Sequence, residues 1–245
     1  MRKTLFSGIA ACLFATAATA AEQSPSVIWT VGQADRSASE FALAPDRFRD
    51  FLANDFGYED KYFLVGHSVP AADFPYVLPG PADTWGGTWP TSGWRTHQVN
   101  ILFGLKEIPS DGTCTLVVDL LDYAKNFLPL VKVSVNTQDA KFQLDAPGLS
   151  VADQRKPNQM EKIVDTLSIT GNLAKATPRR LEIPIRPGVL KAGGNEVTIT
   201  VLEGSWILFD RVSLEGPAGT NVEQPQQLFI RNIEAAPYEL ADGKR

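Results

Sequence analysis

Residues 29–41, WTVGQADRSASEF, open the part of the chain that decides its fold. A matching stretch near the other end reads GNEVTITV at residues 194–201 and continues as SWILFDRVSLEGP at residues 205–217. In residues 197–201 apolar Val and Ile alternate with Thr, which is the period of a strand with one buried face. We interpret the two stretches as the first and last strands of a single domain.

Strand-like runs dominate the chain after residue 95. Their alternation of apolar and polar side chains indicates sheets that bury one face each, as in a two-sheet sandwich. Glycine-rich and Asp/Asn-rich turns separate the runs, and many short strands with such spacing favour a sandwich or jelly roll. The expected strands are residues 99–103, 116–121, 130–136, 181–185, 197–201 and 228–233.

Two segments have helical rather than strand spacing. Residues 45–56 place three Phe and one Leu on one side of a helix that starts near Pro45 and ends before Gly57. Residues 157–167 place Met, Ile, Val and Leu on one face. We therefore expect an all-β fold, an antiparallel β-sandwich with one or two short helices.

The two end segments resemble a known family pattern. They are similar to the C-terminal, carbohydrate-binding-like jelly-roll domain of rhamnogalacturonan lyases, polysaccharide lyase family 4. In that family W-x-x-G-x-x-D-R-[ST]-A-x-[ED]-F opens the domain, and [FY]-D-x-[IV]-x-L-E-G-P closes it. The resemblance covers about residues 27–217. It implies a galactose-binding-like jelly roll and sugar recognition outside the cytoplasm, whereas the family's lyase chemistry lies on another domain.

Three segments are expected along the chain. Residues 1–20 read as a secretory signal peptide, with a basic start, an apolar core too short to span a membrane, and small residues before the cleavage point. Residues 21–217 form the sandwich, and residues 218–245 a linker and terminal strand, or the start of a further domain. The protein is then secreted or periplasmic; Cys114 is the only cysteine left once residues 1–20 are removed, and a buried thiol is expected there.

The charge of the chain bears on its partners. Loss of Arg2 and Lys3 with the leader takes the formal net charge from −5 to −7. An acidic protein lacks the clustered cations that phosphate binding needs, which argues against a nucleic acid partner. No other stretch approaches the ~20 apolar residues of a membrane span.

The candidate carbohydrate-binding residues lie in one glycine-rich segment. Three of the five tryptophans fall within residues 85–94, and their rings could stack on the apolar faces of sugars. Polar neighbours could bond sugar hydroxyls, and an arginine could bind a uronate carboxylate with two hydrogen bonds. The alternative is that the tryptophans only pack a long loop onto the sandwich. The candidates are Asp83, Trp85, Trp89, Trp94, Arg95 and His97.

The family pattern singles out four further residues. Trp29 and Trp206 are expected to pack between the sheets. Asp35 and Asp210 either fix loops by accepting backbone N–H bonds or help to hold a structural calcium, which prefers carboxylate and carbonyl oxygens. No other cofactor is expected.

Three functions are compatible with these features. The leading one is a secreted carbohydrate-binding module that recognises plant cell-wall polysaccharide such as pectin or rhamnogalacturonan, as an accessory to a lyase or hydrolase. The second is an enzyme, a polysaccharide lyase or glycoside hydrolase or a fragment of one. No catalytic residue is identified for it, because a glycosidase pair could be any two carboxylates. The third is a structural domain of a larger enzyme that binds no sugar.

Overall fold

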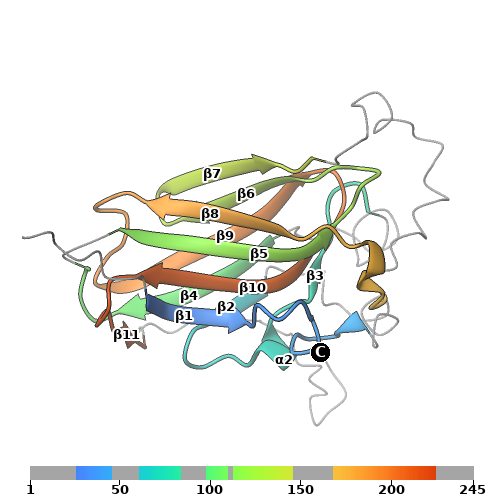
Figure 1. Ribbon diagram of the computed structural model, residues 1–245. Helices are drawn as coiled ribbons and strands as arrows, with labels where there is room; N and C mark the ends of the chain where they lie inside the picture. Colours follow the sequence, from blue (N-terminus) through green and yellow to red (C-terminus); the bar gives the residue numbers. More distant parts are fainter. Residues whose placement is uncertain (1–25, 46–60, 84–97, 110–112, 146–167, 225–245) are drawn as a thin grey trace, which may run out of the picture.

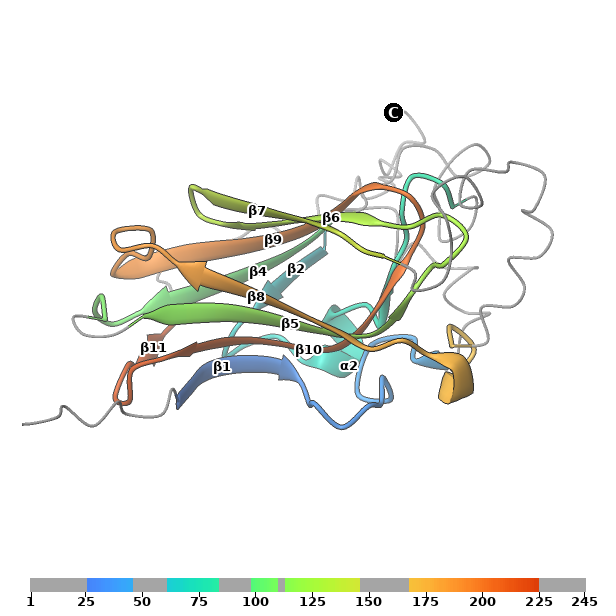
Figure 2. The same cartoon turned by 45° about the horizontal axis from the view of Figure 1, so that its top comes forward.

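The computed structural model describes residues 26–45, 61–83, 98–109, 113–145 and 168–224. They form two stacked sheets (Figures 1 and 2). The first has the order β1-β10-β5-β8, with β3 also pairing with β10. Its strands are β1 (Ser26–Gly32), β3 (Val77–Leu78), β5 (Cys114–Tyr123), β8 (Arg179–Ile185) and β10 (Ile207–Gly216).

The second sheet has the order β11-β4-β9-β6-β7, with β2 also pairing with β4. It is antiparallel except for the β2–β4 pair, which is parallel. This one parallel pair departs from the antiparallel sandwich expected from the sequence, although the all-β sandwich class is confirmed. The strands are β2 (Lys61–Leu64), β4 (Gln98–Leu105), β6 (Leu130–Val135), β7 (Gln138–Gln143), β9 (Gly193–Glu203) and β11 (Val222–Glu223).

The expected pairing of the two chain ends is confirmed. β1 runs antiparallel to β10, with Ser26 opposite Gly216 and Gly32 opposite Arg211. On its other side β10 pairs with β5. Because β10 is hydrogen-bonded to both neighbours, the segments at the two ends of the family pattern form the middle and one edge of a single sheet.

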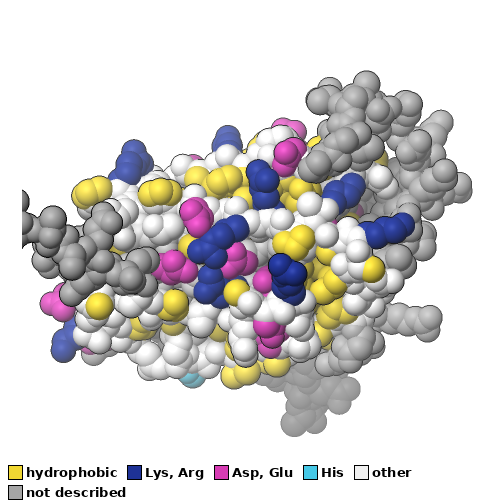
Figure 3. Space-filling model, in the orientation of Figure 1, with side chains coloured by type: hydrophobic (Ala, Val, Ile, Leu, Met, Phe, Trp, Pro, Cys, Tyr) yellow, Lys and Arg dark blue, Asp and Glu magenta, His cyan; other side chains and the backbone are white. Residues whose placement is uncertain are grey.

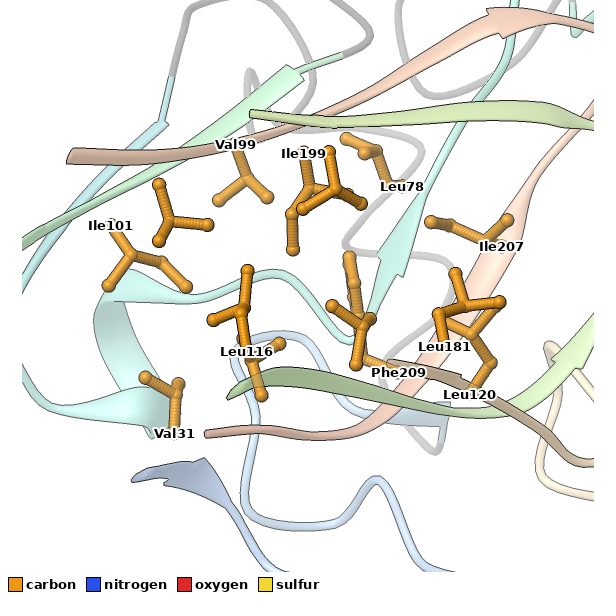
Figure 4. Packing of buried hydrophobic residues seen from close by; sticks show 14 of the residues in the cluster. Val31, Leu78, Val99, Ile101, Leu116, Leu120, Leu181, Ile199, Ile207 and Phe209 are labelled. Atoms are coloured by element: carbon orange, nitrogen blue, oxygen red, sulfur yellow. The ribbon is translucent and has the colours of Figure 1, made fainter. Parts of the chain in front are cut away.

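The core lies between the sheets, as the alternation predicts. Trp29 of β1 contacts Phe103 of β4 across the sandwich, with ring centroids 5.2 Å apart. Trp29 and Trp206 are 4 % and 1 % exposed, so their expected place in the core is confirmed. Cys114 is also buried, and burial raises the pKa of its thiol. Figure 4 shows the facing side chains, among them Val99, Ile101, Leu116, Ile199 and Phe209.

Some elements differ from the sequence-based expectation. The segment after residue 66, for which no helix or strand was expected, contains a short helix, α2 (Pro70–Asp73), and β3, whose two residues are too few to show a period. β7 was not predicted, since its sequence QDAKFQ lacks clean alternation. Two residues of the expected linker form β11. The expected helices at residues 45–56 and 157–167 and the strand at residues 228–233 lie outside the described residues, apart from Pro45.

Neither described helix has the length and apolar character that a bilayer-spanning segment needs. They are α2 and the single-turn η5 (Leu173–Lys175). The expected leader, residues 1–20, lies outside the described part of the chain.

The core packing generates a stability prediction. Phe209 is fully buried and its ring contacts that of Phe74 at 5.1 Å. Removing a buried phenyl ring leaves a cavity, so we expect Phe209→Ala to lower the free energy of unfolding by about 3–5 kcal/mol. Val27→Ala is the control, because Val27 is 51 % exposed. Urea denaturation of both variants checks this, and equal stabilities would contradict the assignment of Phe209 to the core.

Candidate functional site

A cleft of about 460 Å³ opens at the end of the sandwich where β5 ends and β10 begins. This volume falls in the range of small-molecule sites, roughly 300–1,000 Å³. Figure 3 shows hydrophobic side chains gathered at this end of the front face, beyond a central group of charges. The cleft has an apolar part, Ala38, Ala44, Pro45, Leu121, Leu173 and Leu208, and a polar part, Arg36, Ser37, Ser39, Thr170 and Gly171.

The first wall of the cleft is the loop that follows β1. At Gly32 the chain has φ +80°, and a Cβ there would meet the Asp210 carbonyl oxygen at 2.5 Å. Only glycine fits this close passage and favours this conformation. Arg36 also has a positive φ, of 64°, which is uncommon for a residue with a side chain. The loop therefore needs an external brace.

Two carboxylates provide that brace. Asp210 Oδ1 accepts a hydrogen bond from Arg36 N at 3.1 Å, and Asp35 Oδ1 accepts one from Ser37 N at 2.9 Å. The expectation that these residues fix a loop through backbone N–H groups is confirmed. Within the described residues no group of three His, Cys, Asp or Glu side chains is placed to hold a metal. The calcium site at Asp35 and Asp210 stays a prediction.

A local irregularity of β10 directs Asp210 toward this loop. Along β10, Arg211, Ser213 and Glu215 alternate with the core residues Val212 and Leu214. The pairing with β5 shifts register between Leu208 and Phe209 and again between Phe209 and Arg211. A bulge of this kind re-aims side chains. It removes Asp210 from the regular alternation and leaves it 8 % exposed, beneath the cleft wall.

The two charged groups of this wall, the Asp210 carboxyl and the Arg36 guanidinium, differ in burial and in their partners. Desolvation raises the pKa of Asp210 to about 6; the Arg36 N–H opposes this rise, and nearby Asp35, Asp119 and Glu40 add to it. The guanidinium of Arg36 is exposed and forms no ion pair or hydrogen bond with another described residue. It is therefore an available cation at the rim of the cleft, suited to a ligand with an anionic group.

The opposite wall is the segment that leads into β8. Buried Tyr76 donates its hydroxyl hydrogen to the Ile169 carbonyl oxygen at 3.1 Å. Asn172 Oδ1 accepts from Ala174 N at 3.1 Å and caps η5. Thr170 and Leu173 thus project from a segment that is fixed to the core. Together the walls offer hydroxyl groups above an apolar base, which suits a ring with polar edges and an apolar face.

Asp83 is the one sequence-predicted sugar contact within the described residues. It is 4 % exposed; its carboxylate accepts from the Ser205 hydroxyl and, at 2.8 Å, from Gly80 N. Desolvation raises the pKa of Asp83 to about 7, although these two hydrogen bonds act to lower it. Ala82 N also donates to Gly204 O at 2.9 Å. Asp83 therefore anchors its segment to the turn between β9 and β10.

The other five predicted contacts, Trp85, Trp89, Trp94, Arg95 and His97, lie outside the described residues. The chain leaves the described part after Asp83 and re-enters it at Gln98, the first residue of β4. Asp83 contacts Ser205, and the turn there leads directly into β10, whose Leu208 lines the cleft. Asp83 thus lies at the same end of the sandwich as the cleft.

Sequence reasoning missed most of the cleft. Arg36, Ser37 and Ser39 lie inside the quoted opening segment, where the family pattern D-R-[ST]-A-x-[ED]-F was a usable signal. Thr170 and Leu173 had no signal, because no motif links them to residues more than a hundred positions away.

Comparison with known protein families finds one match. Residues 27–214 match a family model described as CBM-like: polysaccharide lyase family 4, domain III. No curated protein matches the chain.

Two solved structures have similar regions. One is a family GH115 4-O-methyl-α-glucuronidase, BtGH115A, with specificity for decorated arabinogalactans. It is 18 % identical in sequence with a TM-score of 0.28, and the match covers 48 % of this chain and 13 % of that chain. The other is dimeric latent PorU from Porphyromonas gingivalis. It is 11 % identical in sequence with a TM-score of 0.27, and the match covers 51 % of this chain and 10 % of that chain. The chain spans only a small part of either protein's length.

The two buried carboxyls generate a pH prediction. Both Asp83 and Asp210 have folded-state pKa values, about 7 and about 6, above the ordinary 3.8. The folded state then binds protons more tightly than the unfolded state. The stability from these groups is complete below the ordinary pKa and is lost as pH rises through about 6 to 7.

We therefore expect the melting temperature to fall between about pH 5 and about pH 8. Asp83→Asn keeps the size of the side chain but cannot ionise, so its profile is expected to be flatter. Glu107→Gln is the control, since Glu107 is exposed and is not among the groups that shift the pKa of Asp83 or Asp210. Parallel profiles for wild type and Asp83→Asn would contradict the prediction.

Proposed function

The chain belongs to the CBM-like family that is domain III of polysaccharide lyase family 4, and we propose that it binds plant cell-wall polysaccharide of the rhamnogalacturonan type. In this proposal it acts outside the cytoplasm as an accessory to a lyase. The cleft at the end of the sandwich takes one acidic sugar. The observation that carries the proposal is the available Arg36 guanidinium beside hydroxyl groups and an apolar base.

The chemistry of the cleft supports sugar over other ligands of its size. A pyranose has apolar C–H faces and a rim of hydroxyls, and both kinds of surface need a partner. Leu173 and Pro45 offer the apolar contact, while the Ser39 hydroxyl, which accepts from Ser37 Oγ at 2.9 Å, has its own hydrogen to donate. Arg36 can bind a uronate carboxylate with two parallel hydrogen bonds.

The predicted tryptophan segment belongs to the same proposal. Asp83, which precedes this segment in the sequence, is bonded to Ser205 in the β9–β10 turn, at the end of the sandwich that holds the cleft. Rings at Trp85, Trp89 and Trp94 could extend the apolar contact beyond the cleft, since aromatic stacking tolerates many ring-shaped ligands. Extracellular action is supported by the leader-like residues 1–20 and by the family's role on polysaccharides.

Arg36 provides the direct test of the cleft. We expect Arg36→Ala to weaken binding of rhamnogalacturonan oligosaccharides about tenfold or more, as loss of a charge-assisted contact implies. Isothermal titration calorimetry measures it. Lys191→Ala is the matched control, because Lys191 is an exposed cation near the start of β9, at the other end of the sandwich. If Arg36→Ala leaves the affinity unchanged, the acidic sugar does not bind in the cleft.

The tryptophans have a separate test. If their rings stack on sugars, each Trp→Ala change at residues 85, 89 and 94 is expected to weaken binding about tenfold, with the melting temperature unchanged. If the rings instead pack inside, each change lowers stability by about 3–5 kcal/mol. Affinity electrophoresis and thermal melts on the single variants separate the two. Early melting without a specific binding loss would favour the structural-domain function.

A further inference from the structure

One edge of the first sheet lacks the features that keep sheet edges from pairing with other strands. β1 is the last strand on its side of the order β1-β10-β5-β8, and within the described residues no strand pairs with its outer edge. Its sequence, SVIWTVG, contains no charged residue and no proline. An open strand of this length and composition is a template for pairing with a further strand.

The other described edges are protected. β8, at the opposite side of the same sheet, has two arginines, a glutamate and a proline in the sequence RRLEIPI. β7, an edge of the second sheet, exposes Asp139 and Lys141. β2 and β11 are four and two residues long. Charges, proline and short length all discourage edge pairing, whereas the exposed residues of β1, Val27 and Thr30, are uncharged.

The two sheets also differ in width on this side. Trp29 of β1 contacts Phe103 of β4, so β1 lies across from β4. At the opposite side Gln138 of β7 donates to the Pro184 carbonyl oxygen of β8 at 2.8 Å, so these two strands also face each other. Each sheet has four strands between these limits, but the second continues past β4 with β2 and β11. One strand position beside β1 therefore has no described occupant.

Apolar side chains are partly exposed next to that position. Ile28 of β1 and Val222 of β11 pack against the core but are not fully buried. The neighbouring part of the second sheet is covered, because Phe63 of β2 packs against Phe74, with ring centroids 5.9 Å apart. A strand added along the first half of β1 would pair with its backbone and bury Ile28 and Val222.

The described part of the chain ends on this same side of the sandwich. β11 pairs with β4 on the side away from β9, and it reaches the same edge of the molecule as β1 (Figure 1). The side-chain amide of Gln224 donates to the Gly66 carbonyl oxygen at 2.9 Å. The next residues in the sequence are 225–227, followed by LFIRNI at residues 228–233, which the alternation of the sequence predicts to be a strand.

The spacing between Gln224 and the predicted strand fits the distance that has to be crossed. Three residues span about 10 Å at most, and stacked sheets lie about 10 Å apart. Residues 225–227 are therefore long enough to lead from the second sheet to the edge of the first. A short linker also gives an effective concentration on the order of millimolar, which favours this segment over a second copy of the chain or a strand of another protein.

We propose that residues 228–233 add to the open edge of β1 as a further strand of the first sheet. The segment lies outside the described residues, and its Leu228, Phe229 and Ile230 supply apolar side chains to cover Ile28 and Val222. The added strand closes the one unprotected edge and keeps β1 from pairing with other molecules. The pairing does not depend on the proposed sugar binding.

Amide hydrogen exchange of the full chain, read residue by residue by NMR, tests this pairing at β1. Alternate N–H groups of an unpaired edge strand face solvent and exchange fast. We expect all β1 amides to be protected in the wild type. Ile230→Pro removes a backbone donor from the added strand, so alternate β1 amides are expected to exchange about tenfold faster or more. Ala241→Pro, the same kind of change outside the segment, is the control and is expected to match the wild type.

The amides of β5 and β9 show in the same experiment whether each variant is folded. If Ile230→Pro does not fold, Asn232→Pro repeats the test within the segment. Fast exchange of alternate β1 amides in the wild type means that the edge is open, which overturns the proposal. Equal protection in the wild type and the proline variant also overturns it, and protection that rises with protein concentration identifies a second copy as the occupant. Protection that is independent of concentration and is lost only with proline inside the segment supports the proposal.

Discussion

The position of β10 between β1 and β5 is the constraint on which the rest of the structure depends. Hydrogen bonds on both sides hold the strand in register, with Gly32 opposite Arg211 and Leu116 opposite Leu214. From this one strand, Leu208 faces the cleft and Phe209 the core. Asp210 braces the loop after β1, and the residues that follow carry the outer charges. Consecutive residues of β10 therefore have different surroundings. This requires a break in the regular in-and-out alternation of the strand's side chains, and the β-bulge supplies that break.

The sequence predicted the framework because period and pairing are local signals. The valines of β6 alternate with polar residues, and Val131, Val133 and Val135 are all fully buried. The end segments were also correctly expected to be neighbours. β2 and β3 were missed, since four and two residues are too few to establish a period, and a parallel partner leaves no signature in so short a strand.

The site was less predictable, because it depends on residues that only the fold brings together. The interpretation of Asp35 and Asp210 as loop braces followed from the tendency of Asp to accept backbone N–H bonds. The bulge that aims Asp210 is invisible in the sequence, where the residue simply interrupts an apolar run. Thr170 and Leu173 reach the cleft through the Tyr76 hydrogen bond to Ile169, a contact between segments 93 positions apart.

The buried carboxylates show why this end of the sandwich suits a ligand. Burial disfavours the charged form of Asp83 and Asp210, and both retain it above pH about 7 only at a cost in stability. In return, each accepts hydrogen bonds that fix a loop without a cation partner. An arginine used as a brace would be neutralised by its own ion pair. Because backbone N–H groups do this work, the Arg36 guanidinium stays available at the rim, so the brace and the ligand do not compete for the same charge.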